Sequence, residues 1–122
     1  MPLHNKILIA DDDSEMLETL SSMLEAEGYA VVKAENGEEA VELSRKELPA
    51  LVMLDIHMPK MNGLAACKEI KSAAVTKAIP VVMLTVEGSI NEIQQAISYG
   101  AKTYITKPSS REEILKVVKS II

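Results

Sequence analysis

Short runs of apolar residues alternate along the chain with longer segments in which apolar residues recur every three or four positions. A continuously apolar run is typical of a strand buried on both faces of a parallel sheet, whereas a spacing of three and four indicates an amphipathic helix. The pattern predicts strands at residues 7–10, 30–32, 51–54, 81–84 and 104–106. We expect the first, third and fourth strands to be buried on both faces, because all of their residues are apolar.

Polar residues, glycine and proline mark the ends of the helices predicted between these strands. Gly28, Pro49 and Gly100 stand where three helices are expected to end, and a further helix is expected from about residue 63 to residue 73. Pairs with capping-box spacing are Asp12 with Glu15, Asn36 with Glu39, Ser89 with Glu92, and Ser109 or Ser110 with Glu112 or Glu113. The predicted apolar faces contain Met16, Leu17, Leu20, Met23 and Leu24 in the first helix, Ile90, Ile93 and Ile97 in the fourth, and Ile114, Leu115, Val118 and Ile122 in the last.

Strict alternation of strands and helices predicts an α/β fold with parallel strands joined by right-handed crossovers. The expected architecture is a doubly wound, flavodoxin-like (βα)5 domain over residues 1–122, with a five-stranded parallel sheet in the order 2-1-3-4-5. In that order the first and third strands are neighbours at the point where the winding reverses. Ligands of such folds bind there, beyond the carboxyl ends of the strands.

Composition narrows the class of protein. Apolar residues make up 48% of the chain and charged residues 25%, which is ordinary for a globular domain. A net charge of -5 disfavours direct binding to nucleic acid. The chain has a single cysteine, Cys67, no signal peptide and no apolar run long enough to span a membrane, so we expect a cytoplasmic protein with no membrane partner. Helical spacing places Cys67 in the core rather than in a reactive site.

Four of the five predicted strands end in, or are followed by, polar residues that fall on one edge of the sheet. Three aspartates follow the first strand, Asp55 ends the third, Thr85 ends the fourth and Lys107 follows the fifth. Taken singly, these residues have structural interpretations: Asp12 could cap the following helix, Asp55 could belong to a turn, and Lys107 could be a solvated charge. Taken together they predict a pocket in which neighbouring carboxylates require a cation.

Oxygen ligands from few carboxylates favour magnesium over a dedicated calcium cage. A cation together with an ammonium group would attract a phosphoryl group, and aspartate is a known nucleophile for phosphoryl transfer. The residues therefore indicate a phosphoacceptor site, with Asp55 as nucleophile and with Lys107 and the Thr85 hydroxyl contacting phosphoryl oxygens.

With these site residues in this order, the sequence resembles the CheY-like receiver domains of two-component response regulators. The resemblance spans the whole chain and rests on five segments in order, each weakly specific alone. They are Ile7–Asp13, Leu54–Pro59, Met61–Gly63, Met83–Thr85 and Lys107–Pro108. The resemblance implies that Asp55 takes a phosphoryl group from the phosphohistidine of a histidine kinase. It also implies that Asp12, Asp55 and the backbone carbonyl of His57 bind Mg²⁺, and that Asp11 acts on the metal through water. Thr85 and Lys107 would contact the phosphoryl group, and the peptide between Lys107 and Pro108 would be cis.

The resemblance also implies a switch, with no activity beyond the domain's own phosphorylation and slow dephosphorylation. Thr85 would move toward the phosphoryl group and Tyr104 would turn inward; the alternative is that Tyr104 is simply a half-buried aromatic of an edge strand. The implied partners are a sensor histidine kinase or phosphotransfer protein and a downstream effector. The expected oligomeric state is a monomer, and the alternative is a dimer that forms on phosphorylation. The face read by partners would comprise the fourth helix, fifth strand and fifth helix, with Asn91, Gln94, Gln95, Lys102, Lys116 and Lys119 facing solvent.

Several positions depart from the commonest family pattern without removing a catalytic group. Val86 is bulkier than usual, Ser109 replaces a usual phenylalanine and Asn62 replaces a usual aspartate. His57 and Glu87 stand where the family tunes dephosphorylation, so the phosphoryl lifetime is not predicted.

Rival functions fit the sequence less well. An aspartyl-phosphate phosphatase would have a second aspartate where His57 stands, a flavin-binding flavodoxin would have a hydroxyl-rich loop after the first strand, and a P-loop protein would have a glycine-rich loop ending in Gly-Lys. The alternatives left open are a receiver-shaped interaction module with little phosphotransfer and a receiver portion of a longer regulator or hybrid kinase.

Overall fold

The computed structural model describes residues 5–86, 89–107 and 109–122. Five parallel strands form one sheet in the order β2-β1-β3-β4-β5, which confirms the predicted topology. The predicted cis peptide before Pro108 and the position of Glu87 lie outside the described residues. In chain order the elements are β1 (Lys6–Ala10), α1 (Ser14–Ala26), β2 (Ala30–Ala34), α2 (Gly37–Glu47), β3 (Leu51–Asp55), α3 (Gly63–Ser72), β4 (Val81–Val86), α4 (Ile90–Ser98), β5 (Thr103–Lys107) and α5 (Arg111–Ile121).

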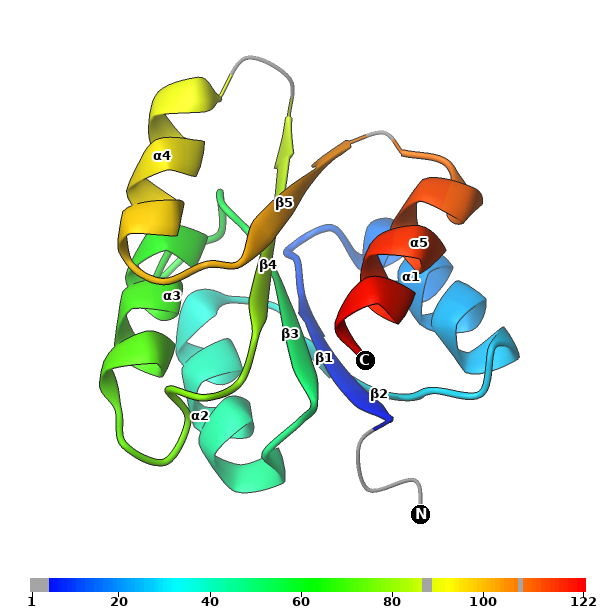
Figure 1. Cartoon of the computed structure of the whole chain (residues 1–122), viewed down its shortest axis with the longest axis horizontal. Coiled ribbons are helices and arrows are strands. Elements are labelled where there is room, and N and C mark those ends of the chain that lie inside the picture. The colour runs from blue at the N-terminus through cyan, green and yellow to red at the C-terminus, as the bar shows by residue number, and fades with distance from the viewer. Residues whose placement is uncertain (1–4, 87–88, 108) are drawn as a thin grey trace.

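Helices cover both faces of the sheet: α1 and α5 lie on one face, and α2, α3 and α4 on the other (Figure 1). Because successive strand residues point to opposite faces, Ile7 and Ile9 pack with α1 and α5, whereas Leu8 and Ala10 pack against the other helices. All five residues of β3 are buried. Every residue predicted for the first, third and fourth strands is buried, so the prediction that these strands are covered on both faces is confirmed.

Helix ends follow the predicted residues, but the capping contacts at α2 and α4 differ from the predicted ones. Ser110 and Glu113 form the predicted capping box at α5. Asn36 caps α2 through the amide of Glu39, but the Glu39 carboxylate accepts from Glu35 rather than closing the box. Ser89 occupies the N-cap position of α4 without a side-chain capping bond to any described residue. Gly28 and Gly100 end α1 and α4 with positive φ angles of 96° and 112°, as the pattern predicted.

The apolar face predicted for α4 is not part of the core. Of the α4 residues, all of which the structure describes, Ala96 alone is buried, while Ile90 is 65% exposed and Ile97 is 44% exposed. The helix contacts α3 and β4 near one edge of the sheet, and these contacts bury only part of its apolar side chains. Ile122, which was predicted to face inward, is 38% exposed because it lies one residue beyond the end of α5.

Parallel pairing brings the carboxyl ends of all five strands to one edge of the sheet. Ala10 pairs with Leu54, Asp55 pairs with Leu84, and Val86 pairs with Lys107. The residues that end or follow β1, β3, β4 and β5 are therefore neighbours in space although they lie far apart in the sequence. Within the described part of the chain, no helix combines the length and apolar character needed to cross a membrane.

Candidate phosphoacceptor site

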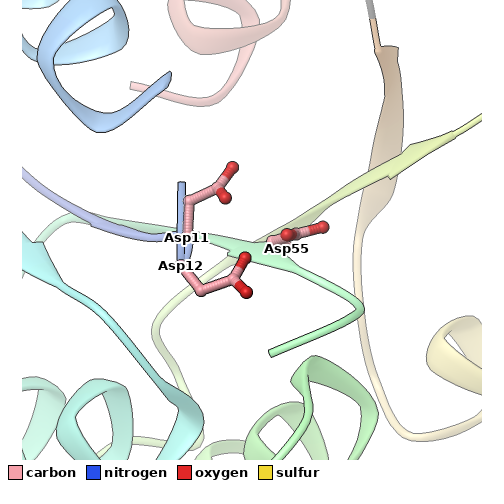
Figure 2. A group of neighbouring side chains, drawn as sticks. All are labelled: Asp11, Asp12 and Asp55. Carbon is pink, nitrogen blue, oxygen red and sulfur yellow. The ribbon is translucent and has the colours of Figure 1, made fainter. Parts of the chain in front are cut away.

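Three carboxylates meet beyond the ends of β1 and β3. One carboxylate oxygen from each of Asp11, Asp12 and Asp55 lies within 4.8 Å of the others; Figure 2 shows two of the side chains on the segment that follows β1 and the third at the end of β3. Asp11 is fully buried, Asp55 is 8% exposed and Asp12 is exposed. Carboxylates this close repel one another unless a proton or a cation lies between them. The strand order thus places a concentrated negative charge at the switch point of the sheet.

The helix that follows this cluster is capped by Asp13, not by Asp12. The Asp13 carboxylate accepts from the amides of Glu15 at 3.0 Å and Met16 at 3.4 Å, and the Asp13 amide donates to the carboxylate of Asp11 at 3.0 Å. The capping interpretation of Asp12 is therefore wrong. Capping-box spacing pointed to Asp12 because Glu15 lies three residues beyond it; Asp13 has Met16 at that spacing and gave no such signal. Asp12 is left free to contribute its carboxylate to the cluster.

Exchanging the two neighbouring aspartates for alanine should separate capping from metal binding. Asp13→Ala is expected to lower the free energy of unfolding by about 1 kcal/mol, because two amides of the first turn of α1 lose their acceptor. Asp12→Ala is expected to leave the metal-free protein at least as stable as the wild type, because it removes a repelling charge, but to abolish Mg²⁺ binding. Urea denaturation and calorimetric titration with Mg²⁺ check the pair; equal Mg²⁺ affinity of Asp12→Ala and the wild type would contradict the assignment.

Lys107 supplies the cation that balances this cluster in the folded chain. Its ammonium nitrogen lies 2.8 Å from Oδ2 of Asp11 and 3.4 Å from Oδ1 of Asp55, and its side chain is 19% exposed. Burial acts to lower the pKa of Lys107, but the hydrogen bond to Asp11 and the charge of Asp55 outweigh it, so the pKa is raised and the group stays charged. A solvated loop charge, the structural alternative for Lys107, does not describe this geometry.

Asp55 carries an unfavourable charge despite the nearby lysine. Burial, and then the negative charge of Asp11, raise the pKa of Asp55 from 3.8 to about 6, although Lys107 acts in the opposite direction. Near neutral pH this carboxylate is therefore ionised in a setting that penalises its charge. Such a group gains free energy when a cation binds beside it.

The two residues proposed to form the switch occupy different environments. Thr85 is 2% exposed and its hydroxyl donates to the carbonyl of Val86 at 3.2 Å. It follows Leu84, the β4 residue that pairs with Asp55, so it lies next to the acidic cluster in the sheet register. Tyr104 lies on the edge strand β5 and is 44% exposed, so in this conformation its side chain is not in the core. The inward movement of Tyr104 stays a prediction.

A contact missed by the sequence pattern joins the segment after β3 to α4. Nε2 of His57 lies 3.3 Å from Oε1 of Glu92, and the His57 side chain is 67% exposed. Capping-box spacing pairs Glu92 with Ser89, and no local spacing relates Glu92 to a residue in another part of the chain. The metal role that the family resemblance implies for the backbone carbonyl of His57 does not involve this side chain and stays a prediction.

Comparison with known proteins identifies the family. The protein-family model for the response regulator receiver domain matches residues 7–119 of this chain. This chain belongs to that family. The receiver domain therefore belongs to a two-component signalling system, and its neighbours in structure share the CheY-like fold.

Individual relatives agree with this assignment. Protein PilH of Pseudomonas aeruginosa is 38% identical over 117 residues, which cover 96% of this chain and 97% of PilH. The chemotaxis protein CheY4 of Vibrio cholerae has a TM-score of 0.91 at 29% identity, covering 98% of this chain and 99% of that structure. The receiver domain of the sensor histidine kinase PA1611 from Pseudomonas aeruginosa, solved with a magnesium ion coordinated in its active-site cleft, has the same fold with a TM-score of 0.89 at 22% identity, covering 97% of each chain.

Other relatives are longer proteins. The chain spans 47% of the length of a probable transcriptional regulator of Porphyra purpurea and 49% of the alkaline phosphatase synthesis transcriptional regulatory protein of Bacillus subtilis. The family thus includes receiver domains that stand alone and receiver domains that form half of a larger regulator.

Proposed function

We propose that this receiver domain is a phosphorylation switch in which Asp55 accepts a phosphoryl group in a Mg²⁺-dependent reaction. The observation that carries the proposal is the meeting of Asp11, Asp12 and Asp55 with the ammonium of Lys107 at one edge of the sheet. Phosphoryl transfer depends on positioning and on neutralising charge, and this edge supplies a nucleophilic carboxylate, a fixed cation and oxygen ligands for a second cation.

The donor set fits magnesium. Its carboxylate oxygens are hard ligands, few in number, and Asp12 is exposed, which leaves room for the water that Mg²⁺ retains. Asp12 and Asp55 would bind the metal directly with the backbone carbonyl of His57, and Asp11 would act through water. The magnesium ion reported in the PA1611 receiver supports the same assignment here. When bound, Mg²⁺ neutralises charge on the carboxylates and on the incoming phosphoryl group.

Transfer begins with one carboxylate oxygen of Asp55 directed at the phosphorus of a phosphohistidine. The new bond joins that oxygen to phosphorus, the bond between phosphorus and the imidazole nitrogen breaks, and the nitrogen leaves with the electron pair. The ammonium of Lys107 holds one phosphoryl oxygen and the hydroxyl of Thr85 donates to another. The product is an acyl phosphate on Asp55, which water hydrolyses slowly, so the domain acts as a phosphoacceptor and not as a turnover enzyme.

The output of the switch is proposed to leave through α4, β5 and α5. Phosphorylation would draw Thr85 toward the phosphoryl group, and Tyr104 would follow inward, shifting a population between two conformations. The six side chains predicted to face solvent on this surface are all exposed, namely Asn91, Gln94, Gln95, Lys102, Lys116 and Lys119. A histidine kinase or phosphotransfer protein would supply the phosphoryl group, and an effector protein or domain would bind the altered surface.

The mass of the intact protein tests the proposal after incubation with acetyl phosphate and Mg²⁺. We expect a gain of one phosphoryl group that is lost in the Asp55→Asn variant and in a sample treated with EDTA. Fast hydrolysis is addressed by adding beryllofluoride, which mimics the acyl phosphate and is expected to shift the amide NMR signals of Thr85 and Tyr104 only with Mg²⁺. Absence of both the adduct and the shift would leave a receiver-shaped interaction module instead.

A further inference from the structure

We infer that Gly37 is a positioning residue for the metal site, because it lets one turn brace both segments that carry the site's ligands. This inference rests on the function proposed above. The turn in question, called here the β2–α2 turn, comprises residues 34–37, from the last residue of β2 to the first residue of α2. None of its side chains belongs to the acidic cluster.

Backbone hydrogen bonds connect the β2–α2 turn to both sides of the site. The amide of Asp11 donates to the carbonyl of Ala34 at 3.1 Å, which ties the turn to the segment that follows β1. The amide of Gly37 donates to the carbonyl of Met61 at 2.9 Å, which ties it to the segment between β3 and α3. That second segment begins directly after Asp55 and contains His57, whose carbonyl is a predicted metal ligand. The turn therefore holds the two ligand-bearing segments at a fixed separation.

Only glycine permits the second of these contacts at the observed distance. A Cβ atom on Gly37 would lie 2.1 Å from the carbonyl oxygen of Met61 and 2.7 Å from its carbonyl carbon. Both are backbone atoms, so they cannot swing aside as the end of a flexible side chain can. Normal van der Waals contact would require the segment after β3 to retreat by about 1 Å or more. Unlike Gly28, Gly37 does not have a positive φ; glycine is required at position 37 because a side chain there would have no room.

A retreat of this size matters for a metal site more than for the core. Ligands must be held to within roughly 0.5 Å of their working geometry, so a displaced His57 carbonyl would bind Mg²⁺ poorly even in a folded protein. The opposite end of the same segment is already fixed by Gly63, whose amide donates to the carbonyl of Ile56 at 2.7 Å. With that end fixed, the displacement caused by a side chain at position 37 falls on the residues between, which include His57.

Calorimetric titration of Gly37→Ala with MgCl₂ tests the inference, with Gly28→Ala as the matched control. Gly28 has a φ of +96° and nothing within 4 Å of an added Cβ, so its substitution strains the backbone at the far end of α1 without touching the site. Denaturant unfolding at the temperature of the titration first shows that both variants are folded there. We expect Gly37→Ala to bind Mg²⁺ about 10- to 100-fold more weakly than the wild type, and Gly28→Ala to bind it as the wild type does.

Unchanged Mg²⁺ affinity in folded Gly37→Ala would overturn the inference while leaving the proposed function intact. Failure of the wild type itself to bind Mg²⁺ would instead overturn both. Should Gly37→Ala not fold, hydrogen exchange of the wild type decides the matter. Because coupling between two sites is reciprocal, Mg²⁺ should slow exchange of the Gly37 amide more than that of the Gly28 amide, which donates to Glu25. Equal effects at the two glycines would overturn the inference.

Discussion

Replacing Asp55 with asparagine is expected to stabilise the metal-free protein above pH 6 and to remove its stabilisation by Mg²⁺. The cause is the cost of an ionised Asp55: burial and the neighbouring Asp11 charge raise its pKa to about 6 from 3.8. Asparagine has nearly the same shape and no charge, so it keeps the packing at the end of β3 and removes the repulsion. At pH 7 to 8 without metal we expect the free energy of unfolding to rise by roughly 2 kcal/mol.

The pH dependence of this effect has a definite sign. Between pH 3.8 and about 6 the unfolded chain has released the Asp55 proton while the folded protein still holds it. The folded state therefore binds more protons in this window, and stability falls as pH rises through it. The contribution of Asp55 is fully present below pH 3.8 and fully lost above about 6. The asparagine variant lacks this loss, so the two proteins should differ little near pH 4 and most above pH 6.

Urea denaturation at a series of pH values in EDTA, repeated with Mg²⁺, measures the effect. Saturating Mg²⁺ should reverse the order of stability, because the wild type gains the free energy of metal binding and the variant does not. Asp13→Asn is the control for loss of one nearby negative charge, since asparagine also caps helices. If Asp55→Asn is no more stable than the wild type at pH 8 without metal, the predicted cost of the Asp55 charge is wrong.

The sheet and the location of the site were predictable because each depends on a strong local signal. Continuous apolar runs such as 51–54 fit few alternatives to a buried parallel strand. Once the strands are parallel, the residue after each run must lie at the common carboxyl edge. The meeting of Asp11, Asp12 and Asp55 follows from the strand order, in which β1 and β3 are neighbours.

The errors and omissions arose where the outcome depends on tertiary geometry. Helical periodicity put Ile90 and Ile97 on one face of α4, but it cannot tell whether a second layer will cover that face, and both residues are exposed. Capping-box spacing selected Asp12 instead of Asp13, because spacing does not show where the first helical residue lies; that position is fixed by how the chain leaves β1. The role of Gly37 was invisible in the sequence because its requirement comes from Met61, which local spacing does not relate to it.

Replacing Lys107 with alanine is expected to have the largest effect on the stability of the metal-free protein. The substitution leaves Asp11, which is fully buried, and Asp55 facing each other without a cation. Removing one partner of a buried ion pair typically costs about 3 to 5 kcal/mol, and the partial exposure of Lys107 places the expected loss near the lower limit.

Two comparisons show whether lost charge compensation is the cause. Lys33→Ala removes an ion pair of the same 2.8 Å length, to Glu18, but both side chains are well exposed, so a much smaller loss of stability is expected. Adding Asp55→Asn to Lys107→Ala should restore part of the stability, because one of the two uncompensated carboxylates disappears, and Mg²⁺ should restore part of it in the single variant. If Lys107→Ala and Lys33→Ala lose stability equally and neither rescue occurs, then Lys107 does not balance the acidic cluster, and the electrostatic basis of the proposed site is wrong.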